Sequence, residues 1–191
     1  SILYLDLSGA IPERYQPADF WQTVQGAEKD GDALVDIIDA LHLAKNDSKI
    51  KGLYINAAGA SAGFATREEI VEALREFKTS GKWVYAYADA YAQGDYMLAS
   101  LADSVFLNPI GAVDVHGVAS QVPFFKGLLD KLGVKMEVVR VGTFKSAVEP
   151  YITDAMSPAS RLQTQVMVDS LWRFYAGVVG DARNVEISQV D

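Results

Sequence analysis

The residues with the clearest chemical potential in this sequence lie in the segment 140–151, which reads RVGTFKSAVEPY. Its lysine, Lys145, has mostly apolar sequence neighbours. A lysine held among apolar groups loses the hydration of its ammonium, so the neutral amine becomes available as a base. Serine–lysine hydrolysis requires such an amine, because it takes the proton from a serine hydroxyl. The simpler interpretation is a solvated lysine paired with Glu149, four residues further along a helix. The spacing alone leaves both interpretations open.

Metal and thiol chemistry have little support. The chain has no cysteine, which excludes disulfides, cysteine-ligated metals and thiol nucleophiles. His42 stands in a helical pattern, and His116 follows Asp114 by two residues, so that these two side chains share one face of an extended segment. No third ligand is spaced to join either histidine, and we expect structural or solvated roles and no metal or cofactor. Asp114 could orient the His116 imidazole, but no Gly-x-Ser-x-Gly elbow supplies a nucleophile for a triad.

The small-residue loop Gly59–Gly63 precedes a helical pattern, and its backbone N–H groups could hold an anion. It matches neither a phosphate-binding Walker loop nor a dinucleotide fingerprint. We therefore expect it to be a strand-to-helix connection.

The bulk composition is that of an ordinary globular domain. The 191 residues are 50% hydrophobic and 22% charged, with a formal net charge of −8. The acidic balance, without any Lys/Arg-rich run, argues against binding a nucleic-acid backbone. No apolar run of about 18 residues and no signal peptide are visible.

Strands alternate with helices along the chain. Apolar runs predict strands at 2–7, 51–56, 83–88, 104–107 and 136–141. Helical periodicity and end signals predict helices at 32–45, 66–80, 93–102, 123–132 and 157–180. A capping box of Thr66 and Glu69 opens the second helix, and Ser157 caps the last. The helix at 123–132 should turn an apolar face inward. Its expected buried residues are Phe124, Leu128, Leu129 and Leu132. The alternation implies right-handed βαβ units and a mainly parallel sheet.

Several segments together resemble the signal peptide peptidase A family, also called protease IV. The matching stretches run in family order and are 51–56, 80–86, 93–103, 109–117, 140–151 and 156–158. The stretch 140–151 is specific, and the others are supportive. The resemblance implies an α/β fold like that of crotonase and the Clp protease, with a mainly parallel sheet, βαβ units and flanking helices.

The resemblance is to the amino-terminal copy of the domain in the family's long, two-domain form. It implies that Lys145 is the general base. The family's nucleophilic serine belongs to the other copy, in an Ala-Ser-Gly-Gly-Tyr motif. The equivalent stretch here is Ala92–Tyr96, where Gln93 takes the nucleophile's place and Asp95 replaces a glycine. The glycine pair that helps form the family's oxyanion hole is not kept cleanly around Ala57–Ala60. The chain thus resembles half an active site, and alone it is expected to be inactive.

The resemblance also carries expectations about the whole protein. We expect 1–191 to be one domain and the amino-terminal half of a longer protease, cut at both ends. Its partners would be extended, apolar signal peptides bound by strand addition, and the carboxy-terminal protease domain of the same or a neighbouring subunit. The full-length form would be a tetramer on the bacterial inner membrane, facing the periplasm through an anchor outside this chain.

Two other classes of function stay open. A coenzyme A-dependent hydratase or isomerase would use Gly59–Gly63 as an acyl-oxyanion site and Glu68 or Glu69 as its base. The sequence has no basic patch that would bind the phosphates of coenzyme A, which argues against this class. A non-catalytic module would serve only assembly or substrate guidance. Trp172 and Tyr175 on the last helix would then be candidate subunit contacts.

Overall fold

The computed structural model describes residues 1–14, 32–139, 142 and 145–190. These residues form two compact units. The first unit contains 1–116 and the segment from Tyr175 onward, and the second contains Gly117–Phe174. Each unit is described by itself below.

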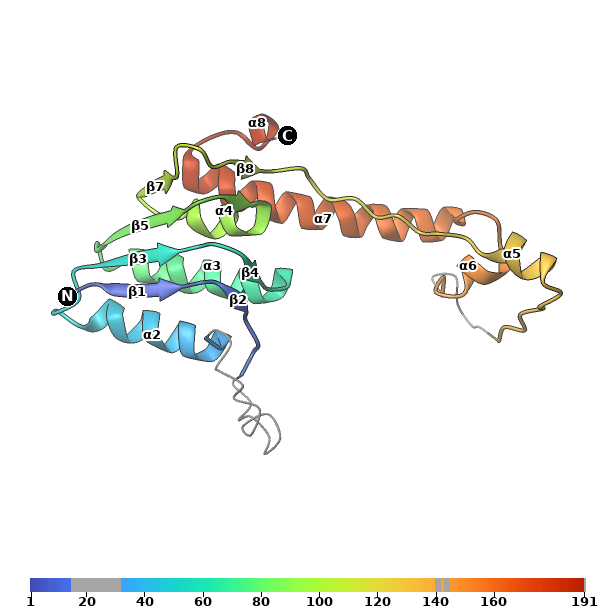
Figure 1. Ribbon diagram of the computed structural model, residues 1–191, viewed down its shortest axis with the longest axis horizontal. Coiled ribbons are helices and arrows are strands. Elements are labelled where there is room, and N and C mark those ends of the chain that lie inside the picture. Colours follow the sequence, from blue (N-terminus) through green and yellow to red (C-terminus); the bar gives the residue numbers. More distant parts are fainter. Residues whose placement is uncertain (15–31, 140–141, 143–144, 191) are drawn as a thin grey trace. The chain divides into compact units, whose positions relative to one another are not determined.

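The first unit is built on a parallel sheet of four strands in the order β1, β3, β5, β7 (Figure 1). The strands are β1 (Leu3–Asp6), β3 (Gly52–Asn56), β5 (Trp83–Ala88) and β7 (Ser104–Leu107). Leu3 lies opposite Leu53, which in turn lies opposite Val84. The strands predicted at 2–7, 51–56, 83–88 and 104–107 are confirmed, as is the mainly parallel α/β sheet with flanking helices.

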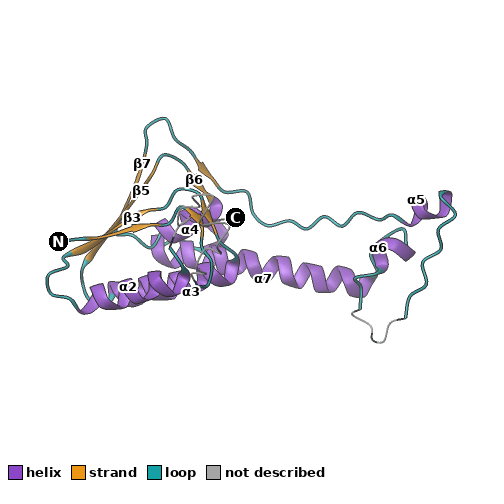
Figure 2. Ribbon diagram, turned by 60° about the horizontal axis from the view of Figure 1, so that its bottom comes forward, coloured by secondary structure: helices purple, strands orange, loops and turns teal. Residues whose placement is uncertain are grey.

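Helices cover one face of this sheet (Figure 2). They are α2 (Leu34–Asn46), α3 (Phe64–Lys78) and α4 (Gln93–Ala99). The strands alternate buried and more exposed residues, as half-buried strands do. The largest fully buried side chains include Leu7, Ile37, Leu41, Leu53, Ile55, Ile70, Leu74, Phe77, Met97 and Leu98. At about 1.5–3 kcal/mol for each large side chain, this core is the main stabilising term of the unit.

Two short parallel strand pairs extend the unit. β2 (Gly9–Ala10) pairs with β4 (Ala60–Ser61), and β6 (Tyr91–Ala92) pairs with β8 (Val113–Asp114). The element order strand, short strand, helix occurs as β3-β4-α3 and again as β5-β6-α4. The loop at Gly59 before β4 therefore corresponds to the loop at 89–90 before β6, and the start of α4 corresponds to the start of α3.

The face of the sheet that α2 and α3 leave uncovered carries aromatic side chains. Tyr4 stacks on Tyr54 with ring centroids 5.8 Å apart, and Tyr85 contacts Trp83 at 4.7 Å and Phe106 at 5.8 Å. Tyr4 and Phe106 are about half exposed. These side chains leave partly exposed aromatic groups on this face of the sheet.

The second unit contains α5 (Lys126–Lys131), α6 (Glu149–Ile152) and the first part of α7 (Pro158–Arg183), a helix that continues into the first unit. The predicted N-cap is confirmed, because the Ser157 Oγ accepts from the Ser160 N–H at 3.2 Å. In the first unit α7 buries Tyr175, and α8 (Ile187–Val190) follows. None of the helices described combines the length and apolar character that crossing a membrane requires.

The predicted start of α3 was wrong. The helix begins at Phe64, and the residue before it, Gly63, is the N-cap without any side-chain hydrogen bond. The Gly63 carbonyl accepts from the Arg67 N–H at 3.0 Å, so helical bonding starts upstream of Thr66. The Thr66 and Glu69 pattern lies inside the helix, where a capping box has no orphan N–H groups to satisfy.

Two predictions for the second unit were also wrong. The helix at 123–132 is reduced to α5, which buries none of its residues, and the supposedly inward Leu128 and Leu132 are 55% and 67% exposed. Residues 136–139 form no strand, because among the described residues no other strand pairs with them. Positions 140–141 of that predicted strand lie outside the described residues.

Candidate active site

The position where the sequence comparison expects Gln93 in place of the nucleophilic serine is the start of α4. Gln93 is its first residue, and the Gln93 Oε1 accepts a hydrogen bond from the backbone N–H of His116 at 3.0 Å. A primary amide carries no hydroxyl or thiol that could attack a carbonyl. Gln93 therefore links α4 to the segment after β8 and leaves this position without nucleophilic chemistry.

Asp95 is a buried carboxylate of the first unit and is only 2% exposed. Its Oδ2 accepts from the Gly59 N–H at 3.0 Å, and its Oδ1 accepts from the Ala60 N–H at 3.2 Å. Gly59 has φ of +76°, a left-handed conformation that glycine adopts without strain. This turn lets two successive N–H groups point at one carboxylate.

Arg67 of α3 holds the other side of the same loop. Its Nη2 donates to the Ala60 carbonyl at 2.7 Å, and its Nη1 donates to the Ala62 carbonyl. The Nη2 also lies 3.9 Å from the Asp95 Oδ1. The guanidinium thus binds the carbonyls of the loop while Asp95 binds its amides, which fixes the loop from both sides.

Burial raises the pKa of the Asp95 carboxyl. Hydrogen bonds from the Gly59, Ala60 and Ala92 backbone and the charge of Arg67 act in the opposite direction without cancelling the effect of burial. Burial likewise lowers the pKa of Arg67, and the negative charge of Asp95, which raises this pKa, does not cancel the effect of burial. Each group is therefore held in a site where desolvation opposes its charge, and the pairing offsets part of that cost.

Lys145 belongs to the second unit and is exposed in this chain. The role of Lys145 as a general base stays a prediction. Residues 140–141 and 143–144, which form much of the motif around Lys145, lie outside the described residues.

Glu149 is the buried carboxylate nearest to Lys145 in sequence, and it is 4% exposed. Its Oε1 accepts from the Ser157 Oγ at 2.6 Å, and its Oε2 accepts from the Ser157 N–H at 3.0 Å. Because Ser157 caps α7, this carboxylate ties α6 to the start of the long helix. Sequence reasoning treated Glu149 only as a partner for Lys145 and missed this anchoring role.

Neither histidine belongs to a metal-binding cluster among the described residues. His42 Nε2 lies 2.9 Å from the Glu76 Oε2, and the Lys45 Nζ donates to Glu76 Oε1 at 3.0 Å. Hydrogen bonds from Lys45 and then His42 lower the pKa of Glu76. His116 and Asp114 are exposed. Among the described residues, no three His, Asp or Glu side chains come together to hold a metal ion.

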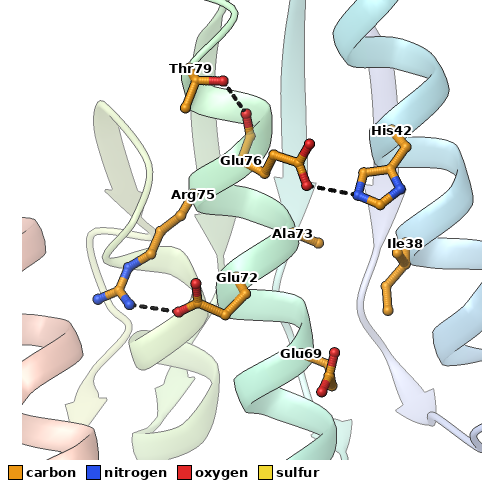
Figure 3. Close-up of a pocket in the computed structure, with 8 residues that line it drawn as sticks. All are labelled: Ile38, His42, Glu69, Glu72, Ala73, Arg75, Glu76 and Thr79. Atoms are coloured by element: carbon orange, nitrogen blue, oxygen red, sulfur yellow. Dashed lines mark hydrogen bonds and ion pairs between the residues drawn. The ribbon is translucent and has the colours of Figure 1, made fainter.

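A groove of about 450 Å³ lies between α2 and α3. Figure 3 shows His42 reaching from α2 toward Glu76 of α3, with Arg75 turned toward Glu72. Exposed ion pairs line this groove, and the described residues give it no activated hydroxyl. We interpret it as a solvated seam between two helices.

The carboxylates considered for acyl-coenzyme A chemistry do not meet the proposed oxyanion loop. Glu68 and Glu69 lie exposed on α3, whereas the Gly59 and Ala60 amides already bind Asp95. No observation in the structure therefore favours a hydratase or isomerase.

Asp95 was missed as a binding group, although the sequence contains a usable signal. An acidic residue three positions after an N-cap, in a helix that continues as Tyr96-Met97-Leu98, is either a cap or the partner of a buried donor. The structure shows both roles, because Asp95 accepts from the Ala92 N–H of its own helix and from the Gly59 and Ala60 N–H groups.

Comparison with known proteins identifies the family. The profile of Peptidase family S49 matches residues 76–191, which include Gln93, Asp95 and Lys145. Protease 4 of Salmonella typhi is 39% identical over 196 residues, covering 98% of this chain and 32% of that protein. Protease 4 of Haemophilus influenzae is 36% identical over 195 residues, with the same two shares.

A plant relative is more distant. The chloroplastic serine protease SPPA of Arabidopsis thaliana is 26% identical over 148 residues, which cover 78% of this chain and 22% of that protein. The chain spans about a third of the length of the Protease 4 relatives it matches. With a family profile over most of its residues and two relatives above 35% identity over nearly all of them, the chain belongs to peptidase family S49.

Proposed function

We propose that this chain is the amino-terminal, lysine-bearing domain of a serine–lysine endopeptidase that degrades cleaved signal peptides. One observation carries the proposal. In an S49 chain, Lys145 is exposed to solvent, while the position expected for the serine holds Gln93. We infer that such a lysine serves a serine that another domain brings to it.

The proposed reaction uses Lys145 as a proton carrier. Its neutral amine takes the proton from the incoming serine, and the serine Oγ attacks the peptide carbonyl carbon. Backbone N–H groups beside that serine stabilise the resulting oxyanion. The Lys145 ammonium then gives its proton to the leaving amine, and water hydrolyses the serine ester by the same relay.

The reaction requires water to be excluded from Lys145, whereas the described part of this chain leaves Lys145 exposed. A second domain or subunit must therefore cover the amine. Apolar side chains of the second unit are available for such a contact, since Leu128, Leu132 and Val139 are all exposed. They support the further proposal that the whole protein is an oligomer, a tetramer, with its sites at domain contacts.

The remaining features of the proposal follow from the family resemblance. We propose a crotonase-like fold, which the repeated strand–strand–helix order supports. The substrate is an extended apolar peptide added as a strand to a sheet edge. The whole protein acts at the bacterial inner membrane, on the periplasmic side, through an anchor outside this chain.

The test compares two lysines of the same unit in the longer protein. Lys145→Ala should lower kcat/KM on a fluorogenic signal-peptide substrate by ~10³-fold, the scale of a lost general base. Lys135→Ala, which also removes an exposed lysine, should change it less than about twofold. The chain alone should show no turnover, and turnover that survives Lys145→Ala would end the proposal. If activity is unchanged in Lys145→Ala but disrupting Trp172 breaks the oligomer, the domain is an assembly module.

A further inference from the structure

The backbone amides of Gly59 and Ala60 have the geometry of an anion-binding pair. They are successive in sequence, they follow a left-handed glycine conformation, and they donate to the two oxygens of one carboxylate. Paired backbone N–H groups of this kind hold negatively charged oxygens in many proteins. Here the anion comes from the protein itself, as the side chain of Asp95.

Capping of α4 does not account for this arrangement. A carboxylate at the third helical position caps its own helix by accepting from the N-cap residue, Ala92. Gly59 and Ala60 lie 36 and 35 residues away in sequence, where the chain enters β4 between β3 and α3. Asp95 therefore joins two repeats of the fold, and capping explains only one of its three backbone partners.

The surroundings keep the carboxylate in place. The Arg67 guanidinium holds the Ala60 and Ala62 carbonyls on the opposite side of the loop. Gly94 leaves room for Arg67, because a Cβ there would lie 2.6 Å from the Arg67 Cζ. The loop, the arginine and the glycine thus form one packed assembly around a carboxylate that is 2% exposed.

We propose that the Gly59–Ala60 amide pair is an oxyanion-type binding site that the Asp95 carboxylate occupies permanently, which closes this domain's own site to a substrate carbonyl or a free carboxylate. Removal of the side chain opens the site to small carboxylates. The inference goes beyond the proposed function and does not involve Lys145. Its readouts need no proteolysis, so its failure and that of the peptidase proposal are distinguishable.

The first experiment uses the unaltered chain. The amide proton shifts of Gly59 and Ala60 are followed by NMR across acidic pH, together with the Asp95 carboxyl carbon. The proposal expects all three to change with one midpoint, because protonation removes the anion from both amides at once. Amide shifts that ignore the Asp95 carboxyl would overturn it, whatever the variants do.

The second experiment adds acetate to Asp95→Ala. Acetate should shift both amides saturably and restore about half or more of the lost melting temperature, by mass action on the folded state. Chloride at the same ionic strength should do neither. Asp103→Ala is the matched control, since the Asp103 carboxylate accepts from a single backbone N–H, that of Val84, and pairs with Lys78.

The outcomes separate cleanly. Acetate rescue of Asp95→Ala alone supports the proposal. Rescue of both variants, of neither, or equal rescue by chloride contradicts it. If Asp95→Ala does not fold, Asp95→Asn replaces it, and an Asn variant whose Gly59 and Ala60 amide shifts match those of the unaltered chain at neutral pH also contradicts it.

Discussion

Glu149→Ala should loosen the start of α7 far more than a surface substitution does. The Glu149 carboxylate is 4% exposed and accepts two hydrogen bonds from Ser157, at 2.6 and 3.0 Å. Each hydrogen bond to a charged group contributes about 1.5–3 kcal/mol, and water can replace part of this once the side chain is gone. We therefore expect a local loss of about 2–3 kcal/mol.

This loss of local stability should be measurable as faster amide hydrogen exchange. At 1.36 kcal/mol for each tenfold change, the amides of the first turn of α7, including Ser160, should exchange about 30- to 150-fold faster in Glu149→Ala. Exchange measured by mass spectrometry on peptides covering the start of α7 reports this region directly. Exchange in α2 should stay unchanged, because α2 lies in the other unit.

The control is Glu137→Ala, which removes an exposed glutamate from the same unit. It should change exchange at the start of α7 by less than about threefold. Equal exchange in Glu149→Ala and Glu137→Ala would refute the reasoning, because the two Ser157 hydrogen bonds would then contribute nothing to the anchoring of α7.

The remaining predictions concern the loop around Asp95. Gly94→Ala should destabilise the chain by about 1–3 kcal/mol in urea denaturation, because the new methyl displaces Arg67 from its carbonyl partners. Gly177→Ala, a helical position with nothing within 4 Å of its Cβ, should instead stabilise by about 0.5–1 kcal/mol; the same sign for both would contradict the packing argument. Since burial raises the folded-state pKa of Asp95, the folded chain binds that proton more tightly than the unfolded chain. Its contribution to stability is therefore greatest below the unfolded pKa of about 3.9 and falls as the pH rises through the folded pKa. In Asp95→Asn, the unfolding free energy measured against pH should no longer show this decrease. An unchanged pH profile would refute the assignment to Asp95.

Much of the first unit could be predicted from the sequence because its elements are strongly patterned. The strands at Leu3–Asp6, Gly52–Asn56, Trp83–Ala88 and Ser104–Leu107 are apolar runs between clear breaks, and β5 and β7 begin and end at the predicted residues. Helix starts were less predictable. Helix α3 begins after the N-cap Gly63, which makes no side-chain cap hydrogen bond, and its carbonyl accepts from the Arg67 N–H, so no side-chain signature marks this start.

The second unit shows the limit of periodicity. The pattern at Leu128 and Leu132 indicates which face of α5 is apolar, but it does not say whether this chain covers that face. The same limit applies to Lys145, which is exposed although its sequence neighbours are mostly apolar. Its solvation depends on contacts that no local pattern encodes.

The candidate site divides in the same way. Lys145 and Gln93 could be singled out because a motif marks their positions. The partners of Asp95 and Glu149 could not, because Gly59 and Ser157 are identified only by distances in space. A buried carboxylate is recognised by its donors, and these come from other elements.

The central claim, that the Lys145 amine is the base for a serine from another domain, is tested most directly by chemical rescue. The chain contains no cysteine, so Lys145→Cys introduces a single thiol into it. The account predicts that this change lowers kcat/KM of the longer protein by ~10³-fold, and that aminoethylation of the thiol, which rebuilds a lysine-like amine, recovers it to within about tenfold. Alkylation with iodoacetamide, which adds no amine, should leave the protein inactive. Full activity in Lys145→Cys, or equal recovery with both reagents, would contradict the claim.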